Sequence, residues 1–127
     1  MSKTSILKIG KDQRFVEKRN FPRYYTTTMC LYREGNGHKV GSTVDLSLGG
    51  ARISAETEFP VAKVLDLFLV LGGQARMVRG EVVYCRRASP AGAYYYSGLR
   101  FRELSPSDRL ALEAYFRSLD KREIPLA

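Results

Sequence analysis

Tryptophan is absent from this 127-residue chain, and histidine, cysteine and methionine occur only once, twice and three times. The longest aliphatic or aromatic run, Leu67 to Leu71, is far shorter than the roughly 20 residues of a membrane-spanning helix. The N-terminal segment MSKTSILKIGK contains no apolar stretch long enough for a secretory signal. The sequence therefore predicts a soluble, cytoplasmic protein without membrane insertion, in which Cys30 and Cys85 are reduced thiols.

The scarcity of metal ligands and nucleophiles argues against an enzyme. The single histidine, His38, falls in an expected turn, and the two cysteines are far apart in the sequence, so no metal site is expected. A Cys–His catalytic pair stays open, but a buried, inert thiol is the commoner state of a strand cysteine. The chain contains no Walker loop, no glycine-rich dinucleotide motif and no nucleophile elbow. We expect no catalytic residue, no metal and no cofactor.

Positive charge is in excess and is unevenly distributed. The chain has 21 Lys and Arg against 13 Asp and Glu, a net charge of +8. Seven of the cations but only two of the anions lie in residues 1–25, so the N-terminal end is the basic end. This charge balance predicts an anionic partner and leaves a polynucleotide, an anionic lipid surface and a small phosphorylated ligand open.

Alternating apolar and polar residues predict six strands, separated by glycine-containing turns. They are expected at residues 24–33, 39–47, 51–56, 64–71, 74–87 and 93–101. Gly80 is expected to mark a bulge or bend in the long fifth strand. The faces expected for the second strand are Val40, Val44 and Leu46 on one side, and Thr43, Asp45 and Ser47 on the other.

One helix is expected at the C-terminal end. It begins with Ser105 as N-cap, Pro106 in the first turn and Asp108 near the positive end of the helix dipole. Its apolar stripe is Leu112, Tyr115, Phe116 and Leu119. Together these elements predict a mainly β fold, a six-stranded antiparallel barrel with a C-terminal helix. Residues 1–18 are expected to form a flexible basic arm, residues 19–120 the barrel domain with its helix, and residues 121–127 a tail.

The segment Arg19-Asn20-Phe21-Pro22-Arg23 contains the first candidate site residues. Pro22 biases Phe21 toward extended backbone, so the two arginines are not a helical pair. An arginine can donate to O6 and N7 of guanine, stack on a purine or hold a phosphate through two hydrogen bonds. A solvated basic stretch is the alternative, and the RxxxR spacing alone does not exclude it.

The second candidate motif is Asp45-Leu46-Ser47-Leu48-Gly49-Gly50. Asp45 and Ser47 are two apart on a strand and are expected to face the same way, while the glycines permit positive φ and close approach of a flat ligand. A carboxylate at this position can accept hydrogen bonds from N1–H and the N2 amine of guanine. The alternative is a turn in which both side chains bind local amides.

The two motifs together resemble the PilZ domain family, bacterial receptors for the second messenger cyclic di-GMP. Arg19 and Arg23 match the RxxxR motif of the family, and Asp45, Ser47 and Gly50 match its DxSxxG motif. The resemblance extends from about residue 17 to residue 119 and includes the later segment Gly98-Leu99-Arg100-Phe101. It implies an antiparallel six-stranded barrel whose flexible N-terminal arm wraps the ligand against the outer surface.

The resemblance also implies a role for each site residue. Arg19 and Arg23 would bind guanine and phosphate, Asp45 and Ser47 would read the guanine edge, and Gly49 and Gly50 would give close backbone access. Lys18 precedes the first arginine, at a position associated in the family with the number of bound ligands, and a cation there is compatible with two stacked molecules. Arg52, Arg86 and Arg87 are further candidates for phosphate contacts, although ordinary surface charge is the preferred interpretation.

These observations predict a non-catalytic receptor that signals to an unidentified downstream protein by ordering residues 1–23. Two alternatives remain. One is a small barrel similar to an OB-fold that binds single-stranded nucleic acid, which is less favoured because the basic charge lies in the arm rather than along an aromatic strand face. The other is a PilZ adaptor with little response to the ligand.

Overall fold

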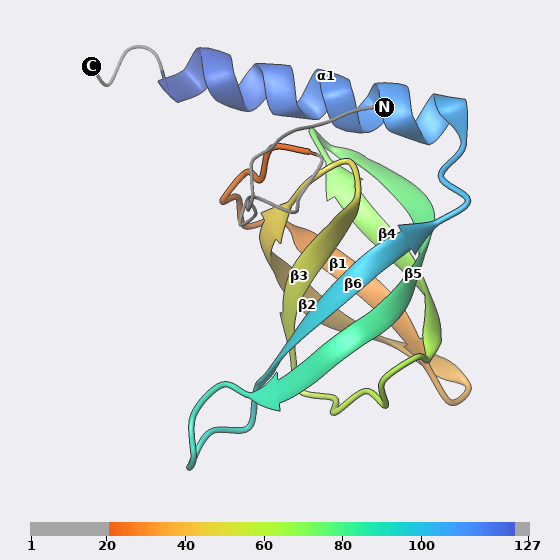
Figure 1. Cartoon of the computed structure of the whole chain (residues 1–127), viewed down its shortest axis with the longest axis vertical. Helices are drawn as coiled ribbons and strands as arrows, with labels where there is room; N and C mark the ends of the chain where they lie inside the picture. Colours follow the sequence, from red (N-terminus) through yellow and green to blue (C-terminus); the bar gives the residue numbers. More distant parts are fainter. Residues whose placement is uncertain (1–20, 124–127) are drawn as a thin grey trace, which may run out of the picture.

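A computed structural model of the chain describes residues 21–123 and shows a mainly β fold with one C-terminal helix (Figure 1). The predicted fold class is confirmed. The predicted arm, with Lys18 and Arg19, lies outside the described residues, as do residues 124–127. The elements are β1 (Met29–Glu34), β2 (Gly37–Leu46), β3 (Gly50–Ala55), β4 (Val64–Leu71), β5 (Gln74–Arg87), β6 (Tyr95–Arg102) and α1 (Pro106–Glu123).

The six strands form a closed barrel in the order β1-β2-β3-β6-β5-β4, and every neighbouring pair is antiparallel. The 14-residue strand β5 joins two parts of this barrel, because its first half pairs with β4 and its second half pairs with β6. The predicted antiparallel six-stranded barrel is therefore confirmed.

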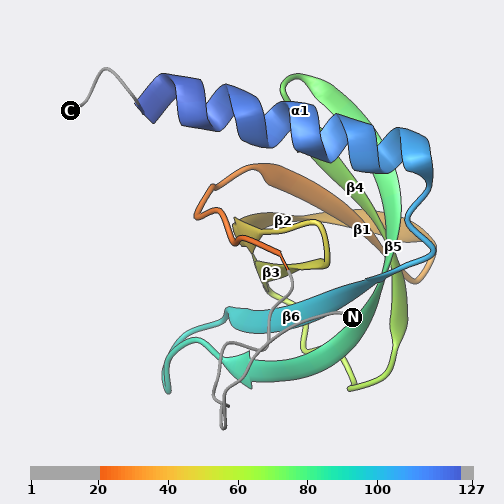
Figure 2. The same cartoon turned by 45° about the horizontal axis from the view of Figure 1, so that its top comes forward.

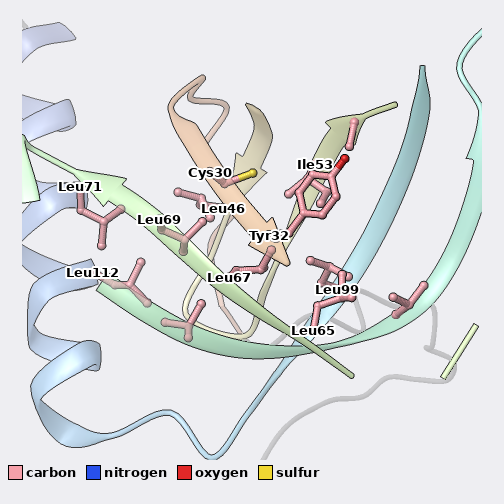
Figure 3. Close-up of a cluster of buried hydrophobic side chains, with 14 of the residues drawn as sticks. Cys30, Tyr32, Leu46, Ile53, Leu65, Leu67, Leu69, Leu71, Leu99 and Leu112 are labelled. Atoms are coloured by element: carbon pink, nitrogen blue, oxygen red, sulfur yellow. The ribbon is translucent and has the colours of Figure 1, made fainter. Parts of the chain in front are cut away.

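Side chains that alternate along each strand fill the barrel interior (Figure 3). On β4 the inward positions are all leucines, and they are buried. Val64 at the start of the strand and Asp66 between two of these leucines are exposed. Complete burial of a leucine side chain stabilises the fold by about 1.5–3 kcal/mol. The fully buried members of this interior include Cys30, Tyr32, Leu46, Ile53, Leu67 and Leu69.

Helix α1 lies across one end of the barrel (Figures 1 and 2). Its start is as predicted, because the Asp108 amide donates to Ser105 Oγ at 3.0 Å and so caps the helix. Leu112 and Phe116 of the predicted stripe are buried. The ring of Tyr24 stacks on Phe116 with centroids 4.3 Å apart, which attaches the segment before β1 to the helix.

The first strand begins later than predicted, at Met29 instead of residue 24. Tyr24 makes only an isolated bridge with Leu46. Between them, Thr43 Oγ1 donates to the Thr26 carbonyl and accepts from the Thr28 amide. A side chain thus satisfies backbone groups that a regular ladder would have paired, so the β-branched composition of this segment does not make it a strand.

The predicted faces of β2 are wrong for Val40 and Thr43. Val40 is 61% exposed, whereas Thr43 is buried. The pairing with β3 shifts at Val44, which is an extra residue between the Thr43–Ile53 and Asp45–Arg52 pairs. This bulge reverses the alternation, so Leu46 points into the barrel and Asp45 points out of it.

Of the bulge or bend expected at Gly80, the bulge is not there. Gly80 pairs regularly with Leu65 and with Phe101, and the irregularity in β5 falls at Val83 instead. A Cβ at Gly80 would lie 3.3 Å from Leu99 Cβ, so this glycine fits a tightly packed part of the barrel interior.

Candidate functional site

A cleft of about 490 Å³ lies on the outer side of the barrel, where the β2–β3 turn, β5, β6 and the segment before β1 meet. It brings together five of the seven predicted site residues, and the other two, Lys18 and Arg19, lie outside the described residues. The lining residues are Phe21, Arg23, Asp45, Ser47, Gly49, Gly50, Ala51, Arg52, Val83, Tyr84, Gly98, Leu99 and Arg100.

The Asp45 carboxylate is the acidic centre of the cleft and is only 4% exposed. Arg52 Nε donates to Asp45 Oδ2 at 3.1 Å, and Arg52 Nη2 forms an ion pair with the same oxygen at 2.9 Å. Arg23 Nε lies 3.8 Å from Oδ1. Burial acts to lower the pKa of Arg52, but the charge and hydrogen bonds of Asp45, together with Tyr84, outweigh it and raise that pKa above its ordinary value. Arg52 is therefore held as a cation beside the Asp45 carboxylate.

The Ser47 hydroxyl organises the turn between β2 and β3. Its Oγ accepts from the amides of Gly49 at 3.0 Å and Gly50 at 3.2 Å, and the Ser47 amide donates to the Gly50 carbonyl at 2.9 Å. Both acceptor positions of this hydroxyl are thus used within the turn, while its hydrogen stays available to a ligand. Ser47 shapes the rim of the cleft whether or not it also touches a ligand.

Of the two reasons predicted for the glycines of the turn, positive φ is wrong. Positive φ occurs at Gly35, Gly72 and Gly73, but not at Gly49 or Gly50. A Cβ on Gly50 would instead lie 2.1 Å from the Leu99 carbonyl oxygen. Glycine is needed at position 50 because the backbones of β3 and β6 approach closely there.

The sequence indicates Arg52 only as a further candidate for phosphate contacts, with surface charge preferred, and it does not indicate Tyr84, but both residues line the cleft. A row of paired residues crosses the cleft from β5 through β6 and β3 to β2: Tyr84, Gly98, Arg52 and Asp45. The Tyr84 ring covers Gly98, where a Cβ would lie 2.3 Å from Cε2 of that ring. The tight turn after Asp45 was a signal for Arg52, because it fixes the hairpin register. No local pattern indicates Tyr84, which joins the row only through the β5–β6 pairing.

The segment before β1 connects the cleft with helix α1. Arg23 faces Asp45 in the cleft, and the Phe21 ring lines the same cleft beside Gly49. The Arg109 guanidinium of α1 lies 5.9 Å from the centroid of the Phe21 ring. Together with the stacking of Tyr24 on the helix, these contacts attach the segment of residues 21–24 both to the cleft and to α1.

The chemistry of the cleft suits an anionic ligand with a flat polar edge. Arg23, Arg52 and Arg100 provide positive charge, the turn offers closely approachable backbone, and Asp45 provides one acceptor group. Within residues 21–119, no group of three or more His, Cys, Asp or Glu side chains is placed to hold a metal ion. In the part of the chain that the structure describes, no helix is both long and apolar enough to cross a bilayer.

Fold and cleft together define a small antiparallel β-barrel with an arginine-lined cleft on its outer surface. The model of the PilZ domain family matches residues 17–118, which is most of the chain. The chain belongs to the PilZ domain family. Among curated proteins, none matches it.

Several solved structures share the fold. The PilZ domain of Escherichia coli YcgR with c-di-GMP is 19% identical, with a TM-score of 0.69 over 84% of this chain and 94% of that one. The K. pneumonia MrkH complex with c-di-GMP is 18% identical, with a TM-score of 0.74 over 88% of this chain and 57% of that one. The Bacillus subtilis inhibitor of motility, MotI/DgrA, is 18% identical, with a TM-score of 0.67 over 84% of this chain. This chain spans 53% of the length of that protein.

Proposed function

We propose that this chain is a bacterial, cytoplasmic, non-catalytic receptor for cyclic di-GMP. The observation that carries the proposal is the single cleft that contains Arg23 from the first motif and Asp45, Ser47, Gly49 and Gly50 from the second. Membership of the PilZ family supports the ligand class, as do the c-di-GMP complexes of YcgR and MrkH. No catalytic residue, metal or further cofactor enters the proposal.

Each group in the cleft has a complementary group on the ligand. Asp45 accepts hydrogen bonds from the Watson–Crick edge of guanine, whose N1–H and N2 amine are donors. Arg23 binds phosphate or stacks on a base, and the turn at Gly49 and Gly50 gives the ligand close access to backbone. Lys18 and Arg19 complete the site, and their charge is suited to two stacked ligands with four phosphate charges.

We propose that the ligand signals by ordering residues 1–23 and thereby changing the surface that a downstream protein meets. Seven of the chain's cations lie in this segment, counting Arg23, so an anionic ligand in the cleft attracts it electrostatically. The proposed downstream protein is one that distinguishes this surface with the ligand bound from the surface without it.

The proposal is tested by isothermal titration of the chain with cyclic di-GMP at near-physiological salt. GTP, cyclic di-AMP and a short single-stranded oligonucleotide serve as competitors. We expect saturable binding of cyclic di-GMP alone, and the inflection gives one ligand or two. Absence of binding in this assay and in a second method would indicate an adaptor, whereas competition by the oligonucleotide would indicate a nucleic-acid-binding barrel.

Substitution of either Arg23 or Asp45 by alanine should weaken binding by about 1–3 kcal/mol, because each removes a charge-assisted hydrogen bond to the ligand. The matched control is Arg79→Ala, which removes an arginine paired with Asp66 away from the cleft. Circular dichroism checks that each variant is folded. Undiminished binding in both cleft variants would place the ligand elsewhere.

A further inference from the structure

Arg52 is bound to Asp45 more closely than any other cation of the cleft. Its Nε donates to the carboxylate oxygen Oδ2, its Nη2 lies 2.9 Å from the same oxygen, and its side chain is only 25% exposed. The pairing is built into the fold, because Asp45 and Arg52 are directly opposite in the β2–β3 register. The guanidinium is therefore held in one place before any ligand arrives.

The strand order places Gly98 and Tyr84 on the side of Arg52 away from Asp45. Gly98 is the next residue of the row that crosses the cleft, and having no side chain it leaves room for the ring of Tyr84. Tyr84 also contributes to the raised pKa of Arg52. Arg52 thus lies in the row between its carboxylate partner and the Gly98 position that the Tyr84 ring covers.

The contact with Arg52 limits the number of hydrogen bonds that Asp45 can accept from a ligand. Oδ2 accepts a hydrogen bond from Arg52 Nε and lies 2.9 Å from Nη2, so this oxygen is occupied by Arg52. Oδ1, which is 3.8 Å from Arg23, is the oxygen with acceptor capacity left for a ligand. Arg52 therefore decides which oxygen of Asp45 is offered to the cleft and in which plane the carboxylate lies.

We propose that Arg52 is a positioning residue for Asp45 and thereby sets the selectivity of this cleft for guanine. The inference rests on the proposed function, since it concerns the base of the same ligand. It differs from a phosphate contact, in which Arg52 would bind the ligand by charge. Arg100 lines the same cleft, is exposed and has no carboxylate partner among the residues the structure describes, so it is the better candidate for a phosphate contact.

The two roles give opposite results when the base of the ligand is changed. Cyclic di-IMP has the phosphates and N1–H of cyclic di-GMP but lacks the 2-amino group. An oriented Asp45 carboxylate would accept a hydrogen bond from that amino group. We expect the unmodified chain to bind cyclic di-IMP at least about tenfold more weakly than cyclic di-GMP, the effect of one hydrogen bond to a charged group. A phosphate contact does not change this ratio.

The experiment measures both dissociation constants by titration for the unmodified chain, Arg52→Gln, Arg52→Lys and the control Arg100→Ala. We expect the preference for guanine to fall to about threefold or less in both Arg52 variants, because neither side chain can reproduce the planar contact of the guanidinium with Oδ2. Arg100→Ala should weaken both ligands equally and keep the ratio. Thermal unfolding identifies any variant that does not fold. Because two Arg52 variants of different charge are made, the ratio can still be measured if one of them does not fold.

The outcomes separate the inference from the proposed function. An unchanged ratio in both Arg52 variants would overturn the positioning role while leaving the receptor intact. Equal weakening of both ligands in Arg52→Gln, with recovery in Arg52→Lys, would overturn it in favour of a phosphate contact. If the unmodified chain bound neither dinucleotide, the receptor proposal itself would fail.

Discussion

Cys30 is a thiol enclosed in the barrel interior, and it contacts no solvent. Burial raises its pKa from about 9.0 to about 11, although a backbone hydrogen bond with Gly41 acts in the opposite direction. The thiolate is the reactive form of cysteine. The interpretation of Cys30 as an inert thiol follows from its position and not from its sequence neighbours.

The raised pKa of Cys30 predicts a pH dependence of stability. The folded state keeps the proton that the unfolded state releases above pH 9, so the free energy of unfolding should fall between pH 9 and pH 11. The contribution is present in full below pH 9, and its loss reaches about 2–3 kcal/mol above pH 11. Urea unfolding at pH 8, 9.5 and 10.5 measures this fall.

The control for this prediction is Cys30→Ala, in which all other titrating groups remain. Its overall stability is lower because a buried atom is removed, but its stability should fall less steeply with pH. Equal slopes in the two proteins would show that another group causes the alkaline loss.

At the scale of the element, β3 depends on the absence of a side chain at Gly50. Alanine at this position would place its Cβ against the Leu99 carbonyl of β6, and a backbone group cannot move away as a flexible side chain can. We expect Gly50→Ala to lower the free energy of unfolding by about 3 kcal/mol or more. The measurement is the urea midpoint followed by circular dichroism.

Gly37→Ala is the matched control, because Gly37 also lies in a strand and a Cβ there would meet nothing within 4 Å. It should change the midpoint little. A similar loss in both variants would contradict the close β3–β6 approach as the reason for glycine at position 50.

Element by element, most strand and helix positions followed from local patterns, with the start of β1 as an exception, whereas side-chain faces did not always do so. β4 and β5 occupy the predicted residues, because their alternation and the Gly72-Gly73 turn are local signals. The β2 faces were wrong because one extra residue, Val44, reverses the alternation, and its position is set by pairing with β3. Bulges depend on a partner strand, which a local pattern does not contain.

The candidate site shows the same division. Asp45 and the glycines after it form a continuous motif, so a sequence pattern could single them out. Arg52 and Tyr84 reach the cleft through strand pairing, the latter from a strand more than thirty residues further along the chain. The residues that strand pairing brings into the cleft could be identified only from the structure.

At the scale of the whole molecule, the cleft and helix α1 share the segment of residues 21–24. Arg23 faces Asp45, while Phe21 and Tyr24 contact the helix through Arg109 and Phe116. A ligand that holds Arg23 in place restrains all four residues and thereby the helix packed on them. Residues 21–24 thus connect a ligand in the cleft to helix α1.

We therefore expect cyclic di-GMP to slow amide hydrogen exchange in residues 1–23 and in the first half of α1. The amides of the turn at Gly72 and Gly73, outside the cleft, serve as the internal control. Phe21→Ala should reduce the added protection of α1 while Arg23 and Asp45 still bind the ligand. Equal protection of residues 1–23 with and without ligand would overturn signalling by ordering of this segment.

The sharing of residues 21–24 between cleft and helix also works in the reverse direction. If a bound ligand favours the docked helix, a protein that holds α1 on the barrel must favour the bound ligand by the same factor, because linked equilibria are reciprocal. The threshold concentration of messenger would then belong to the complex and not to the isolated chain. The same chain can in this way respond at different messenger concentrations, depending on which partner protein is bound to α1.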